Sequence, residues 1–190
     1  GDDMMIKVIA FDFVGVLVTE KDIELTNEED KLERLFGDNI DDSSYLMSAR
    51  NIIKKDSIII RMTEDIIEKL YQVKDNNIFD KIKSKFHDIK IVIATNHVSF
   101  VRNYIGEHLG VDYLDDIIIS AEVHKTKPSP EFFQLLLDKY KINPGELLFV
   151  DDSQRNIDGA KTMKINTIKV DKNMNVCDTV INYLNSSQKK

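Results

Sequence analysis

The 190-residue sequence has one cysteine, no long apolar run and no cluster of basic residues, and each shortage excludes a class of protein. With Cys177 alone, no disulfide can form within the chain, so we expect the reducing cytoplasm as its location. No apolar stretch approaches the ~20 residues that a membrane-spanning helix needs, and no signal-like segment opens the sequence. We therefore expect no membrane partner.

Acidic residues also outnumber basic ones. The chain has 26 Lys and Arg and 33 Asp and Glu, which gives a formal charge of −7. The basic residues are scattered along the chain, whereas a nucleic-acid surface gathers them on one face, so nucleic acid is not an expected partner. The length suits one domain, or one domain with a modest insertion, and a hydrophobic content of 42% is enough for a core. The oligomeric state is not specified by these features.

Short apolar runs rich in Val and Ile predict buried strands, and they lie at residues 6–13, 89–96, 116–122, 146–153 and 166–170. Helical patterns separate the later runs, at residues 98–110, 128–141 and 156–164, with Pro130 in a first turn and Ser153 as an N-cap. Strands that alternate with helices predict an α/β fold with a doubly wound, parallel, Rossmann-like sheet.

The region from Lys21 to His87 departs from this alternation. It is strongly charged and has helical spacing at residues 27–37, 41–55, 63–73 and 78–86. We predict a small helical cap domain, residues 21–87, inserted into a core domain made of residues 1–20 and 88–190. The composition of "SIIIR", residues 57–61, also fits a strand, so the number of cap helices stays open.

Polar side chains follow the predicted strands at one edge of the sheet, where open parallel sheets bind ligands: Asp12, Thr95, Asn96, Lys127, Asp151 and Asp152. Each alone could start a turn, cap a helix or be a solvated charge, but together they favour a site. A carboxylate can attack phosphorus, and acidic oxygens can hold a divalent cation. A hydroxyl and an ammonium can hold the transferring oxygens. These residue types fit phosphoryl transfer through an aspartyl intermediate.

The ordered segments "FDFVGVLV", "IVIATN", "KPSPEFF" and "LLFVDDSQRNIDGAK" resemble the four motifs of the haloacid dehalogenase (HAD) superfamily of hydrolases, from Ile6 to Val170. The insertion resembles the small helical cap of that superfamily's first subclass. The resemblance implies a hydrolase in which Asp12 is the nucleophile and Lys127 balances charge. It also implies that Thr95, with Asn96 beside it, binds the substrate phosphate.

The same resemblance implies a Mg²⁺ cofactor held by the Asp12 carboxylate, the Val14 carbonyl and Asp152. Asp151 and Asn156 match further positions of the last motif and are expected to support these ligands. Hard oxygen donors without a nearby thiol or paired histidine are the ligands that Mg²⁺ prefers.

Val14 departs from the family pattern, because phosphatases of the superfamily usually have an aspartate there that protonates the leaving group. Val14 keeps the backbone carbonyl and lacks the acid, a loss of roughly 100- to 10,000-fold in rate unless another group substitutes. His97 titrates near neutrality and is one candidate substitute, and the alternative is a histidine of the loop without a catalytic role.

Three interpretations follow. The first is a Mg²⁺-dependent phosphatase for a small phosphorylated metabolite with a good leaving group, such as a sugar 1-phosphate or an acyl phosphate, resembling the glucose-1-phosphate phosphatase branch. The second is an enzyme like the 2-haloacid dehalogenases, and the third a catalytically impaired protein that binds a phospholigand. Cap residues would select the substrate, with Arg34, Tyr45, Arg50 and Arg61 as candidates.

Overall fold

The computed structural model describes residues 5–37 and 41–187, and it confirms the predicted α/β fold. A five-stranded sheet has the order β5-β4-β1-β6-β7, and every neighbouring pair is parallel. The strands are β1 (Val8–Phe11), β4 (Lys90–Thr95), β5 (Asp116–Ile119), β6 (Leu147–Asp151) and β7 (Asn166–Lys169). All five predicted strand runs therefore belong to this sheet, with β1 at its centre.

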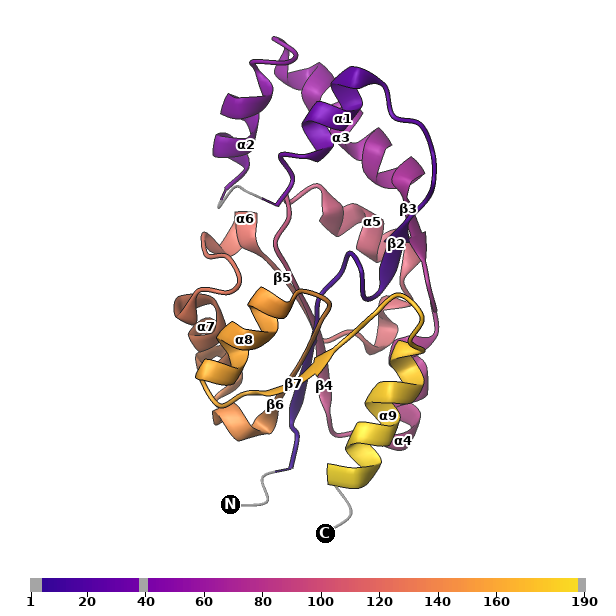
Figure 1. The fold of residues 1–190 in the computed structure, drawn as a ribbon, viewed down its shortest axis with the longest axis vertical. Helices are drawn as coiled ribbons and strands as arrows, with labels where there is room; N and C mark the ends of the chain where they lie inside the picture. The colour runs from indigo at the N-terminus through magenta and orange to yellow at the C-terminus, as the bar shows by residue number, and fades with distance from the viewer. Residues whose placement is uncertain (1–4, 38–40, 188–190) are drawn as a thin grey trace.

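Helices cover both faces of the sheet because side chains alternate along each strand. On β1, Val8 and Ala10 face a core built with α7 (Pro130–Tyr140) and α8 (Gln154–Thr162), whereas Ile9 and Phe11 face the opposite core. That second core includes α4 (Ile78–Lys85), α5 (Val101–His108) and α9 (Val176–Ser187), as Figure 1 shows. Three short helical segments complete the layers: η1 (Val111–Tyr113), α6 (Ser120–Val123) and η2 (Pro144–Glu146).

The N-termini of α7 and α8 have the expected sequence signals. Pro130 occupies the first turn of α7, and the Ser129 side chain accepts a hydrogen bond from the Phe132 amide. At α8 the Ser153 side chain accepts one from the Asn156 amide. Both helices therefore begin just past a strand end or loop of the site edge, with their first amides partly satisfied.

Three helices lie together beyond the sheet, at the top of Figure 1: α1 (Asn27–Glu33), α2 (Asp42–Ala49) and α3 (Asp56–Leu70). The "SIIIR" segment lies in α3 and not in a strand. Its Ile59 is buried together with Thr63, Ile66 and Leu70, which repeat at helical spacing. The helical alternative is therefore the correct one.

A two-stranded antiparallel sheet connects these helices to the core: β2 (Val18–Glu20) pairs with β3 (Tyr71–Val73). Helix α4 follows β3 and packs against α9 beside the main sheet (Figure 1). The predicted cap, residues 21–87, thus includes one helix that lies with the core, and its bounds as a domain stay a prediction.

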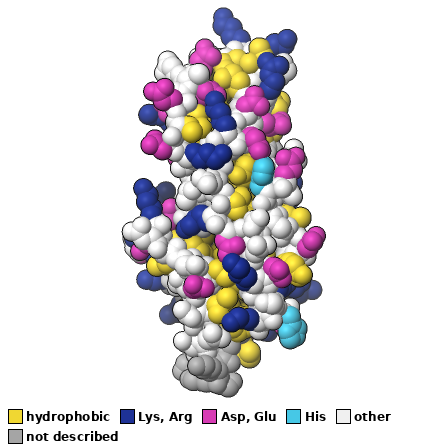
Figure 2. Space-filling model, turned by 90° about the vertical axis from the view of Figure 1, so that its right-hand side faces the viewer, with side chains coloured by type: hydrophobic (Ala, Val, Ile, Leu, Met, Phe, Trp, Pro, Cys, Tyr) yellow, Lys and Arg dark blue, Asp and Glu magenta, His cyan; other side chains and the backbone are white. Residues whose placement is uncertain are grey.

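The surface shows no segregation of charge on the face in Figure 2, where basic and acidic side chains alternate from top to bottom. Within residues 5–37 and 41–187, every helix is too short or too polar to cross a membrane.

Candidate active site

The site lies at the carboxyl edge of the central strands. Asp12 directly follows β1, Thr95 ends β4, and Asp151 ends β6 with Asp152 next. Because β4 and β6 are the two neighbours of β1, these three strand ends are adjacent. The structure therefore gathers the predicted residues as expected, and Lys127 reaches the same place from the segment between α6 and α7.

Lys127 forms the centre of the arrangement. Its ammonium donates to Asp12 Oδ1 at 2.8 Å and to Asp151 Oδ2 at 2.9 Å, and its side chain is only 1% exposed. Burial lowers the pKa of Lys127, but the Asp12 and Asp151 carboxylates outweigh this effect and raise it overall. The lysine is therefore charged and holds the Asp12 and Asp151 carboxyl groups together.

Asn96 fixes the position of that lysine. Its side-chain amide donates to the Lys127 carbonyl at 2.9 Å, and its side-chain oxygen accepts from the Lys127 amide at 2.9 Å. Both ends of the Asn96 side chain are thus engaged by the backbone of one residue. Sequence reasoning placed Asn96 beside the substrate, and the structure adds this positioning contact; substrate binding by Asn96 stays a prediction.

Asp12 is buried, and its carboxyl group lies among other acids. Burial raises the pKa of Asp12 from 3.8 to about 8, with further increases from Asp151 and Asp152, while Lys127 opposes the shift. The carboxyl groups of Asp12, Asp151 and Asp152 offer oxygen atoms within 4.8 Å of one another. The raised pKa of Asp12 indicates that one ammonium does not offset the acids around it. The hard oxygen donors of this cluster suit a divalent cation, whose positive charge would favour the ionised form of Asp12.

Asp151 and Asp152 differ in their available oxygens. Asp151 is fully buried and already accepts hydrogen bonds from Lys127, from Asn156 Nδ2 at 3.2 Å and from the Ser153 amide at 2.9 Å. Asp152 is exposed. The Asp152 carboxylate is therefore the freer of the two to hold a cation, and Asn156 supports Asp151, as the motif implies.

The loop after β1 approaches Asp152 closely. Gly15 has a φ of +92°, and a Cβ atom at this position would lie 2.2 Å from Asp152 Oδ2. The Gly15 amide also donates to the Val18 carbonyl at 2.8 Å, which turns the chain back towards β2. Glycine is required here for both conformation and space. The sequence carried this signal in "FVGV", although the prediction considered only Val14.

His97 lies in the loop after β4, and its side chain is buried. Val98 N–H donates to Nδ1 at 2.9 Å, so the neutral ring has its proton on Nε2, 2.6 Å from Tyr71 Oη. Burial lowers the pKa of His97 to about 3. Both ring nitrogens are occupied and the ring is neutral at pH 7, which disfavours His97 as the missing acid.

The four candidate cap residues are arranged differently from one another. Tyr45 is buried and shares a hydrogen bond of 2.5 Å with Thr63, and Arg50 forms an ion pair with Asp56 at 2.8 Å. Arg34 pairs with Asp30 at 3.1 Å on its own helix. Arg61 is exposed. Beside Lys127 lies a cavity of about 360 Å³ instead, bounded by Gly37 of the cap, Asn96 and Arg155 among others.

Comparison with known proteins decides the family. The model of the haloacid dehalogenase-like hydrolases matches residues 6–164. The chain belongs to this family. The predicted membership of the HAD superfamily is therefore confirmed.

Curated relatives differ in the identity and in the length of sequence that they share with this chain. Acyl-CoA dehydrogenase family member 10 of Mus musculus is 27% identical over 65% of this chain, which spans 11% of that protein. D-ribitol-5-phosphate phosphatase of Bacteroides thetaiotaomicron is 36% identical over 30% of the chain and 28% of that protein. A phosphoglycolate phosphatase of Vibrio vulnificus is 24% identical over 82% of the chain and 79% of its own length. The chain thus spans less than a third of the first two relatives.

Solved structures share the fold. A predicted HAD-like family hydrolase from Porphyromonas gingivalis has a TM-score of 0.74 at 19% identity, covering 95% of this chain and 98% of its own. A mutant HAD family enzyme from Bacteroides thetaiotaomicron, in complex with magnesium and inorganic phosphate, has a TM-score of 0.71 at 18% identity over 90% and 96%. L-2-haloacid dehalogenase from Xanthobacter autotrophicus has a TM-score of 0.62 at 17% identity over 87% and 78%.

Proposed function

We propose that this HAD-like hydrolase is a Mg²⁺-dependent phosphatase for a small phosphorylated metabolite, acting through an aspartyl phosphate on Asp12. The observation that carries the proposal is the Lys127 ammonium held between Asp12 and Asp151, with Asp152 in the same cluster. The phosphatases among the relatives support it.

The reaction proceeds in two displacements. An Asp12 carboxylate oxygen attacks phosphorus, the phosphorus–oxygen bond to the leaving group breaks, and an aspartyl phosphate forms. Water then attacks that phosphorus, releases inorganic phosphate and restores the Asp12 carboxylate. Thr95, buried at the end of β4, donates its hydroxyl to a phosphoryl oxygen, and Lys127 neutralises the charge that gathers in each transition state.

The donor set fits Mg²⁺. The Asp12 carboxylate, the Val14 carbonyl and Asp152 would hold the ion, and the Gly15 backbone leaves room for Asp152 to approach. When bound, Mg²⁺ supplies positive charge that offsets the repulsion between the carboxylates and the phosphate. Asp151 stays with Lys127 and Asn156 and keeps the lysine in place.

The substrate preference follows from Val14. Without an acid at this position and with His97 neutral and fully engaged, a leaving oxygen departs with little protonation. The enzyme therefore acts best on groups that need little help, such as the anomeric oxygen of a sugar 1-phosphate or the carboxylate of an acyl phosphate. This proposed preference agrees with the resemblance of the first motif to the glucose-1-phosphate phosphatase branch of the superfamily.

The cap acts over this site. Residues 21–87 form the small helical cap of the first HAD subclass in this proposal, with α1, α2 and α3 as the part that faces the substrate. The antiparallel β2–β3 pair is the connection about which these helices move.

The alternatives are less well supported. The fold likeness to a haloacid dehalogenase concerns architecture, and the acidic pair Asp151 and Asp152 is the feature that favours a metal-dependent phosphatase over metal-free attack on carbon. A protein that only binds a phospholigand would keep the same site without turnover.

A screen of phosphorylated metabolites tests the proposal. Phosphate release is measured with and without Mg²⁺ for the wild type and for Asp12→Asn, with circular dichroism to show that both are folded. We expect release that needs Mg²⁺ and falls by at least roughly 1,000-fold in Asp12→Asn, because the nucleophile is lost. Equal release by the two proteins would exclude Asp12 as the nucleophile.

A further inference from the structure

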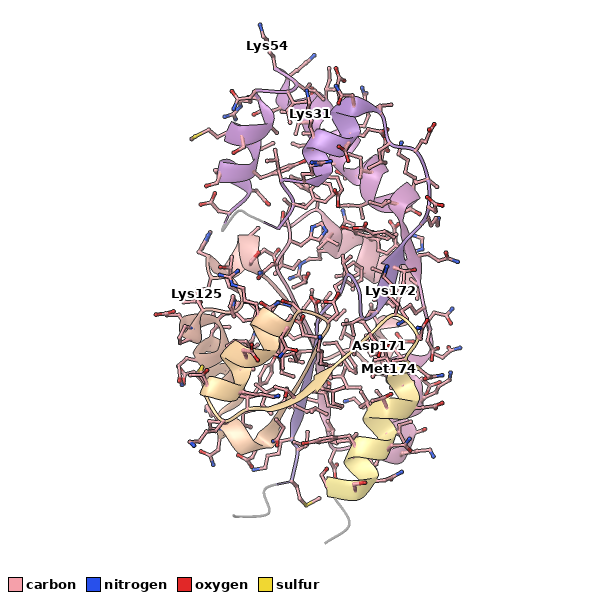
Figure 3. The ribbon with its side chains drawn as sticks, viewed as in Figure 1. Lys31, Lys54, Lys125, Asp171, Lys172 and Met174 are labelled. Atoms are coloured by element: carbon pink, nitrogen blue, oxygen red, sulfur yellow. The ribbon has the colours of Figure 1, made fainter. Side chains whose placement is uncertain are left out.

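The residues that follow α1 pack against the loop after β4, residues 96–99. The ring centroids of Phe36 and His97 are 5.1 Å apart. A Cβ atom on Gly37 would lie 3.8 Å from the Asn96 carbonyl oxygen, so the two backbones are close there. The opposite end of the cap helices, where Figure 3 labels Lys54, points away from the core. The loop that contains Asn96 therefore lies directly against the cap.

Asp42, in the first turn of α2, binds the end of the same loop. Its Oδ1 atom accepts a hydrogen bond from the Ser99 amide at 2.9 Å, and its Oδ2 atom accepts another from the Ser99 hydroxyl. The contact is partly buried and joins residues that are 57 positions apart in the sequence. Hydrogen bonds to a carboxylate are stronger than those between neutral groups. Asp42 thus fixes Ser99 through both of its carboxylate oxygens.

The local structure explains why Ser99 takes a partner from the cap. Its carbonyl accepts from the Arg102 amide at 3.0 Å, so Ser99 belongs to the turn that opens α5. The N-cap residue of this helix is Phe100, whose side chain has no oxygen to accept a hydrogen bond from a helix amide. A carboxylate is also favoured near the positive end of a helix. Asp42 therefore does from the cap what an N-cap side chain does within its own helix.

The same loop positions the lysine of the site. The Asn96 side chain binds the Lys127 backbone at both of its ends, and the Lys127 ammonium lies within the acidic cluster. The core fixes the middle of the loop, since the His97 amide donates to Ser120 Oγ at 3.0 Å. The end of the loop at Ser99 is bound by the cap. Contiguous contacts of this kind can carry coupling between two parts of a protein.

We propose that Asp42 is a positioning residue, which couples the cap to Lys127 through the loop of residues 96–99. While the cap covers the site, the Asp42 carboxylate holds Ser99, and the loop keeps Asn96 against the Lys127 backbone. When the cap moves away, Ser99 loses this acceptor, and both the loop and the lysine are held less firmly. The effect on turnover rests on the proposed phosphatase activity, whereas the effect on the loop does not.

Amide hydrogen exchange, followed by NMR without substrate, tests the coupling in Asp42→Ala, Ser99→Ala, Asp42→Asn and Asp65→Ala. Asp65 is an exposed acid of α3 and is the matched control for the lost charge. In Asp42→Ala the Ser99 amide should exchange about tenfold faster, and the Lys127 amide, which donates to Asn96 Oδ1, about threefold faster. Asp42→Asn keeps an acceptor oxygen and should stay within about twofold of the wild type, as should Asp65→Ala.

Steady-state kinetics on p-nitrophenyl phosphate with Mg²⁺ tests whether the coupling reaches the reaction. We expect kcat to fall by about tenfold in Asp42→Ala and about threefold in Ser99→Ala, with KM changed by less than about twofold, because Lys127 acts on the transition state. Asp42→Asn should restore most of the rate. A rise in KM without a fall in kcat would show that Asp42 only retains substrate, and would contradict a positioning role.

The exchange data separate this inference from the proposed function. If Lys127 exchange rises as expected but the wild type releases no phosphate, the coupling stands and the phosphatase proposal fails. Unchanged Lys127 exchange in both Asp42→Ala and Ser99→Ala, or equal exchange in Asp42→Ala and Asp65→Ala, would overturn the coupling. Faster exchange throughout β1 and β6 in both variants would assign the effect to a general loss of stability and would overturn it as well.

Discussion

At position 14 the backbone and the side chain contribute separately. In the proposed ligand set the Val14 carbonyl binds the cation, and a carbonyl is present whatever the side chain, whereas proton donation requires an acid. His97 does not replace it, because its ring is buried between Phe36 and Tyr71 with both nitrogens hydrogen-bonded. We therefore propose that valine at position 14 removes one proton-transfer step and leaves the proposed metal ligands in place.

His97 makes the fold sensitive to acid. Its folded pKa, about 3, lies below the value of 6.5 for a free histidine, so below pH 6.5 the unfolded chain binds a proton that the folded protein does not. His97 should therefore contribute a loss of about 2 kcal/mol between pH 7.5 and pH 5, which adds to the contributions of the other titrating groups. On going from pH 7.5 to pH 5, the stability of His97→Gln should change more favourably than that of the wild type by about this amount, as measured by urea unfolding at both pH values.

The control for this prediction is His87→Gln, since the His87 side chain is 84% exposed. Its stability should change between the two pH values as that of the wild type does. An equal change in His97→Gln and His87→Gln would contradict the assignment of acid sensitivity to His97.

The location of a single residue was predictable where the residue lies at the end of a strand in a parallel sheet. Asp12, Thr95 and Asp151 were expected together because strands that neighbour one another end at one edge. Burial of His97 was not predictable, since it depends on Phe36 and Tyr71, which come from distant parts of the chain.

Among the elements, the buried strands were the easiest to predict. Short Val and Ile runs that alternate with helical patterns along a chain are typical of buried parallel strands. Helix α3 was ambiguous because its three consecutive isoleucines fit a strand locally, and only the longer spacing from Ile59 to Leu70 reveals the helix. Helix α4 packs beside the main sheet because it contacts α9, which is distant in the sequence. The sequence pattern of α4 alone does not reveal this contact.

The turn between β1 and β2 depends on Gly15. Gly15→Ala introduces a Cβ atom that would overlap Asp152 Oδ2 and a φ that alanine rarely adopts. We expect Mg²⁺ affinity to fall by at least about tenfold in calorimetry, as Asp152 is displaced, and Asp152→Ala should abolish binding altogether.

Gly106→Ala is the matched control, because no atom lies within 4 Å of the added Cβ in α5. It should bind Mg²⁺ normally and gain about 0.5–1 kcal/mol in stability, as alanine favours the helix. Equal Mg²⁺ affinity in Gly15→Ala and Gly106→Ala would contradict the proposed ligand set.

In the whole molecule, the residues of the candidate site and the helices above them come from different parts of the fold. The carboxyl edge of the sheet supplies Asp12, Thr95 and the acidic pair, and the segment between α6 and α7 supplies Lys127. Helices α1, α2 and α3 lie beyond that edge (Figure 1). The sequence could indicate the chemistry because it is concentrated in four local motifs. It could not indicate the substrate, because Tyr45, Arg50 and Arg34 are engaged within the helices and the remaining contacts depend on three-dimensional packing.

The dependence of rate on leaving-group pKa tests the central claim most directly. The wild type and Val14→Asp are compared, with Mg²⁺ present, on acyl, p-nitrophenyl and alkyl phosphates. We predict a steep fall in wild-type rate as leaving-group pKa rises. Val14→Asp should flatten it by accelerating the poorest leaving groups most, by up to roughly 100- to 10,000-fold. Equal slopes in the two proteins, or no turnover of p-nitrophenyl and acyl phosphates above the Asp12→Asn background, would contradict the account.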